Sequence, residues 1–411
     1  MVRLLTLLLP LGLASAGQML TTRDQSVGTS RNLIVGAPGQ ILSYSFDGKV
    51  FANHANVTEA GTSASWMIFK YPNLLYAVDE NSNSTRVFNF NPVDSTLSAE
   101  PVSAANGSSG VVSLAFDKNQ THLVGASYSQ GQVDVWDISP TDGSLKLLKQ
   151  VPLPGPTGPA AAQAVHRAHQ AVLDPTGQFF AIADLGGDAI HFLDTSSWEI
   201  TSSAVVKPAG AGPRHGAFIG GEDMCLPKYY VVACELKSLI ILYELSQTDD
   251  GKMELKNPQT LSTYGDAFPP ANATSAAAGE LIASHNERDI YVSNRLTGNA
   301  TDSISHFVVK DGKLQFADQI SSGGSIPRQL SFSTEESFVF GTNQGGDSGL
   351  VAFQRNMGDG TLSALAALSN SEISAQGTNL GPQFVQEIPM YTHQIPAQWV
   401  DGVPQWGNVQ G

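Results

Sequence analysis

Six ionisable side chains interrupt otherwise apolar, strand-like segments of this sequence. They are His169, Arg214, Glu235, Glu280, Arg295 and Arg328. Arginine grips carboxylates and stabilises oxyanions through its planar guanidinium group, whereas histidine exchanges protons near neutral pH and glutamate can pair with either. A concave site that combines an acid, a base and cations is suited to general acid–base catalysis. The other interpretation is a set of structural ion pairs, because charged residues at buried positions are usually paired.

These residues lie in a pattern that recurs seven times. Each repeat has a short apolar strand, a polar turn and a second strand that ends on a large anchor residue. The first strands begin at Leu33, Leu75, Leu123, Phe180, Tyr230, Ile290 and Val339, and the anchors are Tyr44, Phe90, Trp136, Leu193, Tyr243, Phe307 and Phe353. The anchors are 46 to 64 residues apart, and repeats of about 40–50 residues are typical of four-stranded propeller blades. We therefore expect an all-β chain that forms a seven-bladed β-propeller with four-stranded antiparallel blades.

The repeat also gives a register for comparing blades, because inner strands of a propeller line one central channel. The first series comes from the strand that precedes the first strand of a repeat, and its members are the residues that open this preceding strand. They are Ser65, Val112, His169, Arg214, Glu280 and Arg328. The other is the sixth residue of each first strand: Glu80, Tyr128, Leu185, Glu235, Arg295 and Gln344. Charge and imidazole concentrate at these two positions. The register predicts that they converge at one end of the channel.

Turn signals and composition changes set the domain limits. Asp-Gly pairs that favour type I′ hairpins follow several anchors: Asp47-Gly48, Asp142-Gly143, Asp250-Gly251, Asp311-Gly312 and Asp359-Gly360, with Asp94-Ser95 as a variant. We expect one propeller over residues 33–390, a polar lead-in over 17–32 and a C-terminal tail over 391–411. The segment 265–279 is expected to be a loop over one face.

Composition excludes several classes of partner. The chain has 411 residues, with 22 Lys and Arg against 37 Asp and Glu, and a formal net charge of −15. Such a charge disfavours nucleic acids and anionic membrane surfaces. Apart from the N-terminus, no run approaches the ~18 apolar residues of a membrane-spanning helix.

The N-terminus predicts export from the cell. Arg3 precedes an apolar run from Leu4 to Leu13, and Ala14-Ser15-Ala16 is a small-residue cleavage site. This pattern is typical of a secretory signal peptide over residues 1–16, although a buried N-terminal strand is the alternative. Six N-x-S/T sequons follow, at Asn56, Asn83, Asn106, Asn119, Asn272 and Asn299, each beside an expected turn. Together they predict a secreted, extracellular protein that carries N-linked glycans.

The chain has two cysteines, Cys225 and Cys234. In an oxidising compartment they could form one local disulfide across the intervening turn. The equally weighted alternative is two buried thiols on separate strands. Neither cysteine has the setting of a nucleophile.

Five segments together resemble a known family, the seven-bladed propeller lactonases, which includes carboxymuconate cyclase and phosphogluconolactonase. They are HQAVLDPTGQFFAIADLGGD from His169, GPRHGAF from Gly212, ELKSLIILYEL from Glu235, IYVSNR from Ile290 and IPRQLSF from Ile326. The resemblance covers nearly all of the chain after the N-terminal leader. It implies active-site roles for His169, Arg214, Glu235 and Arg295, which the repeat register had already selected.

This combination predicts an enzyme of lactone rings, acting by intramolecular lactonisation of a carboxymuconate or by hydrolysis of an aldonolactone. The expected substrate is a small anionic or sugar-acid lactone. Further substrate contacts are expected from Arg328, Glu280, Gln344, Glu80 and His215. No metal or cofactor is expected, because His166 and His169 lack a third ligand at a zinc-site spacing. The alternative from another class is a non-catalytic secreted or cell-surface glycoprotein that uses its propeller as a binding platform.

Overall fold

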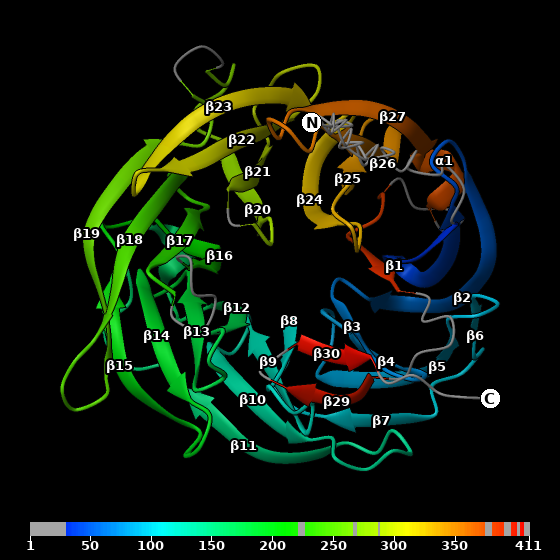
Figure 1. Ribbon diagram of the computed structural model, residues 1–411, viewed down its shortest axis with the longest axis horizontal. Coiled ribbons are helices and arrows are strands. Elements are labelled where there is room, and N and C mark those ends of the chain that lie inside the picture. Colours follow the sequence, from blue (N-terminus) through cyan, green and yellow to red (C-terminus); the bar gives the residue numbers. More distant parts are fainter. Residues whose placement is uncertain are drawn as a thin grey trace, which may run out of the picture.

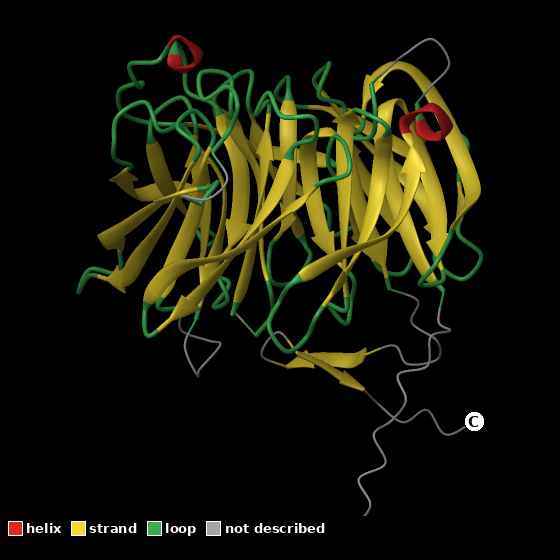
Figure 2. Ribbon diagram, turned by 90° about the horizontal axis from the view of Figure 1, so that it is seen from above, coloured by secondary structure: helices red, strands yellow, loops and turns green. Residues whose placement is uncertain are grey.

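The computed structural model describes residues 30–220, 227–265, 269–286, 288–374 and 380–389, together with the backbone of two strands at 396–400 and 403–406. Seven antiparallel sheets stand in a ring around a central channel (Figure 1). Seen from the side, the strands run between two faces that carry the loops (Figure 2). The expected seven-bladed β-propeller is confirmed.

In six blades the chain moves outward from the channel, whereas in the blade of β1 and β2 the innermost strand is β28, from the end of the propeller; corresponding strands form concentric layers. The innermost strands are β3 (Met67–Lys70), β8 (Val111–Phe116), β12 (Ala168–Leu173), β16 (Pro213–Ile219), β20 (Ala277–Ala283), β24 (Ser325–Phe332) and β28 (Phe384–Ile388). The second strands are β4 (Leu74–Val78), β9 (His122–Ser127), β13 (Phe179–Asp184), β17 (Tyr229–Cys234), β21 (Asp289–Arg295) and β25 (Phe338–Gly345), with β1 (Arg31–Phe46) in the blade of β28. The first strand of each sequence repeat is therefore the second strand of its blade.

The outer layers complete the blades. The third strands, which carry the anchors, are β5 (Ser84–Asn91), β10 (Gln132–Asp137), β14 (Ala189–Asp194), β18 (Leu239–Gln247), β22 (Ser303–Lys310) and β26 (Ser348–Arg355). The outermost strands are β2 (Phe51–Ser63), β6 (Thr96–Leu97), β7 (Ser103–Asn106), β11 (Lys146–Pro152), β15 (Glu199–Val205), β19 (Met253–Ser262), β23 (Lys313–Ser321) and β27 (Leu362–Ser369). The other elements are the 3₁₀ helix Ala161–Gln163, α1 (Asn370–Ile373), β29 (Pro396–Val400) and β30 (Val403–Trp406).

The apolar pattern of each strand follows its layer. All six residues of β13, FFAIAD, are buried, because both faces of this middle strand pack against neighbouring blades. The outermost strand β11, KLLKQVP, alternates exposed with more buried positions, because one of its faces meets solvent. Continuous apolar runs therefore form the middle of the blades and alternating runs form the rim.

The hydrophobic core is divided among the junctions between blades. Seven clusters of buried side chains occur in the described residues, each spanning two adjacent sheets. Trp136, for example, packs with Tyr76 between one pair of blades, and Phe307 packs with Ile240 between another. The anchors identified in the sequence are thus the residues that hold neighbouring blades face to face.

The ring closes by joining the two ends of the propeller in one sheet. The first half of β1 pairs with β28, from Asn32 opposite Ile388 to Gly36 opposite Phe384. The second half of β1 pairs with β2. Between the halves, Pro38 precedes Gly39, whose φ of 74° is the left-handed conformation expected after proline in a type II turn. Because β1 begins at Arg31, the last two residues of the expected lead-in belong to the propeller.

The expected turn type is correct at one of the five Asp-Gly pairs. All five glycines, and Ser95 of the variant pair, have the positive φ that such turns require. A type I′ turn also needs a positive φ at the first central residue, and Asp311 is the one aspartate of these pairs that has it, at 52°. The other four pairs close their hairpins with left-handed glycine alone.

All six sequon asparagines are exposed. Five lie in turns or at strand ends, whereas Asn56 lies within β2, so the expectation of an adjacent turn is wrong for Asn56. Residues 1–29, which include the expected signal peptide, lie outside the described residues.

The remaining sequence features have plain structural outcomes. Cys234 on β17 is a free, buried thiol, and burial raises its pKa; Cys225 lies outside the described residues. In the expected C-terminal tail, β29 and β30 pair with each other. None of the helices in the described part of the chain is long and apolar enough to cross a membrane.

Two glutamines join inner strands of neighbouring blades. Gln170 on β12 accepts a hydrogen bond from the backbone N–H of Gly216 on β16, at 2.7 Å. Gln329 on β24 accepts one from the backbone N–H of Val385 on β28, also at 2.7 Å. These bonds tie the strands that surround the channel, and both side chains are largely buried.

We expect Gln170→Leu to lower the free energy of unfolding by about 1–3 kcal/mol, because the buried N–H of Gly216 loses its acceptor. Chemical denaturation measures this change. The matched control is Gln315→Leu on the exposed face of β23, which should change stability by less than about 0.5 kcal/mol. Equal stability losses in the two variants would contradict a special role for Gln170.

Candidate active site

The sequence positions singled out on the inner strands coincide with irregularities in the β-ladder. In five blades, two residues of the inner strand lie opposite one residue of the second strand, near the end of the channel that holds the site. The extra residues are Val112, His169, Arg214, Arg328 and one of the pair Gly279-Glu280. A β-bulge of this kind breaks the regular alternation and re-aims side chains. The bulges turn side chains that would face a neighbouring blade toward the shared axis.

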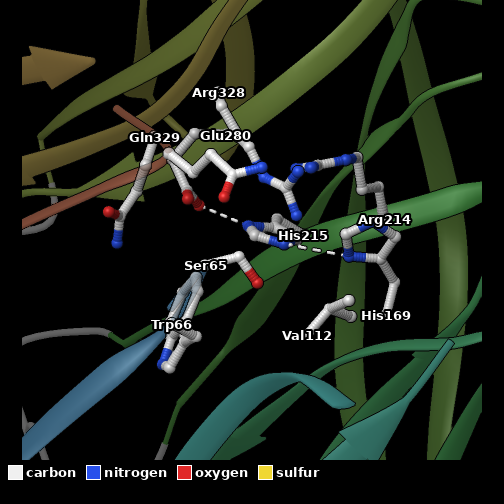
Figure 3. Close-up of a pocket in the computed structure, with 10 residues that line it drawn as sticks. Ser65, Trp66, Val112, His169, Arg214, His215, Glu280, Arg328 and Gln329 are labelled. Carbon is white, nitrogen blue, oxygen red and sulfur yellow. Dashed lines mark hydrogen bonds and ion pairs between the residues drawn. The ribbon is translucent and has the colours of Figure 1, made fainter. Parts of the chain in front are cut away.

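These side chains line one cavity at the end of the channel (Figure 3). Each blade contributes one residue at the corresponding position. They are Ser65, Val112, His169, Arg214, Glu280, Arg328 and Gln383. Trp66, His215 and Gln329 complete the lining, and the space between these side chains, counted together with the solvent at its open mouth, is about 200 Å³.

Three buried side chains form a chain of hydrogen bonds across this cavity. Nδ1 of His215 lies 2.5 Å from Oε1 of Glu280, and its Nε2 lies 3.1 Å from Nδ1 of His169 (Figure 3). His169 is 6 % exposed, and His215 and Glu280 are each 2 % exposed. The ring of Trp66 meets His215 edge-on, at 5.6 Å between centroids. The three residues come from three consecutive blades, so the packing of neighbouring blades brings them together.

Two groups of ion pairs lie around this chain of hydrogen bonds. Oε2 of Glu235 lies 2.8 Å from Nε of Arg214 and 2.9 Å from Nη2 of Arg295, so one carboxylate forms ion pairs with two guanidinium groups. Nη2 of Arg328 lies 2.5 Å from Oε2 of Glu80. Glu235, Arg295 and Glu80 stand at or just beyond the ends of second strands, beside the bulges of the inner strands. Both series of sequence positions therefore meet at the same end of the channel.

Burial and neighbouring charges shift the titration of these groups. Burial, assisted by Arg214, lowers the pKa of His169 well below the usual value of histidine. Burial also lowers the pKa of His215, although Glu280 opposes this effect. Burial and Arg295 lower the pKa of Arg214 to about 10, which leaves it charged at neutral pH. Burial raises the pKa of Glu235, but Arg295 and Arg214 outweigh it and the net pKa is lowered.

The cavity contains polar atoms that have no hydrogen-bond partner within the described protein. Nη1 of Arg214 and Oε2 of Glu280 are both buried in this state. An unpaired buried polar atom costs about 1–3 kcal/mol. Native proteins leave few such atoms, so each needs an explanation. A ligand with an oxygen acceptor and a hydroxyl donor could satisfy both.

The structure brings together most, but not all, of the predicted site residues. His169, Arg214, Glu235, Arg295, Arg328, Glu280, Glu80 and His215 form the three connected groups just described. Gln344 shares the register of Glu235 but neither lines the cavity nor bonds to these groups in the described structure. Its assignment to substrate binding therefore gains no support from the geometry.

Sequence reasoning missed Gln383, Trp66 and Gln329. Gln383 precedes β28, which follows the last repeat, so Gln383 belongs to neither series. A closed ring of seven blades needs an inner strand there, and this requirement is the signal that could have identified the seventh position. Trp66 and Gln329 each follow a residue of the inner-strand series, and this one-residue offset is the signal that could have identified them. His215 occupies the same offset after Arg214.

No group of three or more His, Cys, Asp or Glu side chains in the described ranges is placed to hold a metal ion.

Comparison with known proteins identifies relatives that cover most of this chain. The family model described as "Lactonase, 7-bladed beta-propeller" matches residues 25–373. A probable 6-phosphogluconolactonase of Arthroderma benhamiae is 28 % identical over 302 residues, which cover 71 % of this chain and 74 % of that protein. The 6-phosphogluconolactonase of Bacillus subtilis is 30 % identical over 294 residues, covering 71 % and 75 %.

Solved structures show the same fold. The periplasmic gluconolactonase of Pseudomonas aeruginosa superposes with a TM-score of 0.72 at 22 % identity, over 88 % of this chain and 99 % of that one. A protein from Lactobacillus plantarum superposes with a TM-score of 0.71 at 22 % identity, over 88 % and 100 %. With the family model matched across most of the propeller, the chain belongs to the seven-bladed β-propeller lactonase family.

Proposed function

We propose that this protein hydrolyses an uncharged sugar-acid lactone outside the cell. Membership of the lactonase family supports a lactone-hydrolysing enzyme. The observation that carries the proposal is the pairing of two groups at one cavity. His169 makes its hydrogen bond through Nδ1, which leaves Nε2 for a ligand, and Arg214 presents the unpaired N–H of Nη1.

The reaction needs one base and one oxyanion donor. Neutral His169 takes a proton from water through Nε2, and the resulting hydroxide attacks the lactone carbonyl carbon. The guanidinium groups of Arg214 and Arg295 stabilise the negative oxygen of the tetrahedral intermediate. The bond between the carbonyl carbon and the ring oxygen then breaks, and His169 returns its proton to that ring oxygen. The product is an open hydroxy acid, whose carboxyl group loses its proton to solvent.

Charge balance favours a neutral substrate over an anionic one. Three guanidinium groups face three carboxylates in the cluster, and each guanidinium already has a carboxylate partner. A phosphate dianion or a tricarboxylate would bring two or three negative charges to a cluster whose formal charges already cancel. Lactonisation of carboxymuconate, the other activity implied by the family resemblance, starts from such a polyanion, and the relatives reported above are named as 6-phosphogluconolactonases rather than as cyclases.

We expect His169→Ala and Arg295→Ala each to fold and to lower lactone hydrolysis at least ~100-fold, as the loss of a general base or an oxyanion donor does. The assay compares glucono-1,5-lactone, its 6-phosphate and carboxymuconate, with spontaneous hydrolysis subtracted. The unphosphorylated lactone should have the highest kcat/KM.

The control is His54→Ala, which removes an exposed histidine of β2 and should leave turnover unchanged. Wild-type turnover in both site variants would refute the assignment of the site. If the wild-type protein turns over none of the three compounds, the binding-platform alternative replaces the enzymatic one.

The lowered pKa of His169 predicts the acid side of the pH profile. The base must be neutral, and because its pKa is lowered it stays neutral below the usual histidine pKa of about 6.5. We therefore expect kcat/KM to be constant through neutral pH and to fall only as pH drops through that lowered pKa. Initial rates between about pH 4 and pH 8 measure this. A fall centred above about pH 6.5 would contradict the assignment of His169 as base.

The N-terminal signal pattern and the six exposed sequon asparagines support export and glycosylation. We expect expression in a eukaryotic host to place the protein in the medium, with a mass that falls on treatment with peptide N-glycosidase. Asn272→Gln should remove one glycan increment, because Asn272 is exposed in a loop. Asn89→Gln, an exposed asparagine outside any sequon, is the control. Retention in cells without glycans would refute this proposal.

A further inference from the structure

The hydrogen bonds from Glu280 through His215 to His169 determine which ring nitrogens of the two histidines carry a proton. Oε1 of Glu280 accepts from the backbone N–H of Leu281, at 3.0 Å, as well as from Nδ1 of His215. A carboxylate oxygen only accepts hydrogen bonds. Nδ1 of His215 must therefore carry the proton, and a neutral imidazole then has its lone pair on Nε2.

The same logic extends one residue further. Nε2 of His215, holding the lone pair, must accept the hydrogen bond from Nδ1 of His169. His169 then has its proton on Nδ1 and its lone pair on Nε2. That is the only neutral tautomer of His169 in which Nε2 can take a proton from water.

Aromatic rings and charged groups surround the two imidazoles. Trp66 covers one side of His215, and the two histidine rings meet edge-on with centroids 5.0 Å apart. Tyr128 stands edge-on to His169, at 5.5 Å. The charged groups that face the two imidazoles come from four strands, β16, β20, β21 and β24, and from the turn after β17. They are Arg214, Glu235, Glu280, Arg295 and Arg328.

We propose that Glu280 and His215 are positioning residues that hold His169 in the tautomer with an unprotonated Nε2. This inference rests on the proposed hydrolysis and adds the groups that prepare its base. When His169 takes the proton from water, the carboxylate of Glu280 stabilises the imidazolium charge through His215. Glu280 acts through the two rings without contacting the reacting atoms, although its free Oε2 also lies at the cavity.

Two variants separate the tautomer from the charge. In Glu280→Gln the amide oxygen can still accept from Leu281 and His215, so the tautomer is kept while the negative charge is lost. We expect kcat to fall at least ~10-fold, whereas loss of a contact between Oε2 and bound substrate would appear as a higher KM. Glu280→Met has no acceptor, so His169 should become a mixture of both neutral tautomers. Glu280→Asp, which keeps the charge, should recover part of the kcat lost in Glu280→Gln.

A double-mutant cycle tests whether Glu280 acts through His169. In the His169→Ala background, Glu280→Gln should change kcat by less than about twofold, because the base on which it acts is absent. Equal losses in both backgrounds would show that Glu280 acts directly on substrate and would overturn the proposal. The control is Asp117→Asn, which removes the carboxylate beside His122 at a turn outside the cavity and should leave kcat unchanged.

Nitrogen-15 NMR of histidine-labelled protein reports the tautomer without any assay of activity. We expect His169, assigned by the loss of its signals in His169→Gln, to carry its proton on Nδ1 in the wild type and in Glu280→Gln. A proton on Nε2 in the wild type would overturn the proposal. If the tautomer is as proposed but no lactone is hydrolysed, the positioning stands and the proposed function fails.

Discussion

An extra residue near the start of the inner strands is the constraint on which the site depends. In a regular antiparallel ladder, side chains alternate between the two faces of a blade, and both faces are filled by apolar contacts with neighbouring blades. The bulges at His169, Arg214 and Arg328 break that alternation. Polar groups can then reach the axis without entering the apolar clusters. Beyond each bulge the inner and second strands pair again in regular antiparallel register. The rest of the blade therefore packs against its neighbours as a regular sheet.

Sharing of carboxylates makes this concentration of charge tolerable. A lone buried guanidinium would cost several kcal/mol in desolvation, but Glu235 pairs with both Arg214 and Arg295 and offsets part of their charge. The same pairing holds the two guanidinium groups in fixed positions before any ligand arrives, so little reorganisation is needed when charge develops on a substrate. The unpaired Nη1 of Arg214 is the part of this network left for the ligand.

The sequence was sufficient for the fold and for most of the site, because a repeat converts distant residues into equivalent positions. It found His169, Arg214 and Glu235 without any structure. It missed Gln383, because the strand that follows this residue lies beyond the last repeat and is recognised as part of the ring only if closure by pairing with β1 is assumed. Pairings such as Arg328 with Glu80 depend on side-chain conformations across the channel, which no register specifies. The Asp-Gly signal located the hairpins but not their turn type, because left-handed glycine is common to several turns.

Ring closure by β1 and β28 has a consequence for synthesis of the protein. The strand that completes the ring is among the last parts of the propeller to leave the ribosome, and it must find a partner made more than 300 residues earlier. Until then the nascent chain has an open edge at β1, which is a template for pairing with other chains. A product that ends before Gln383 would lack both this residue and the closing strand β28.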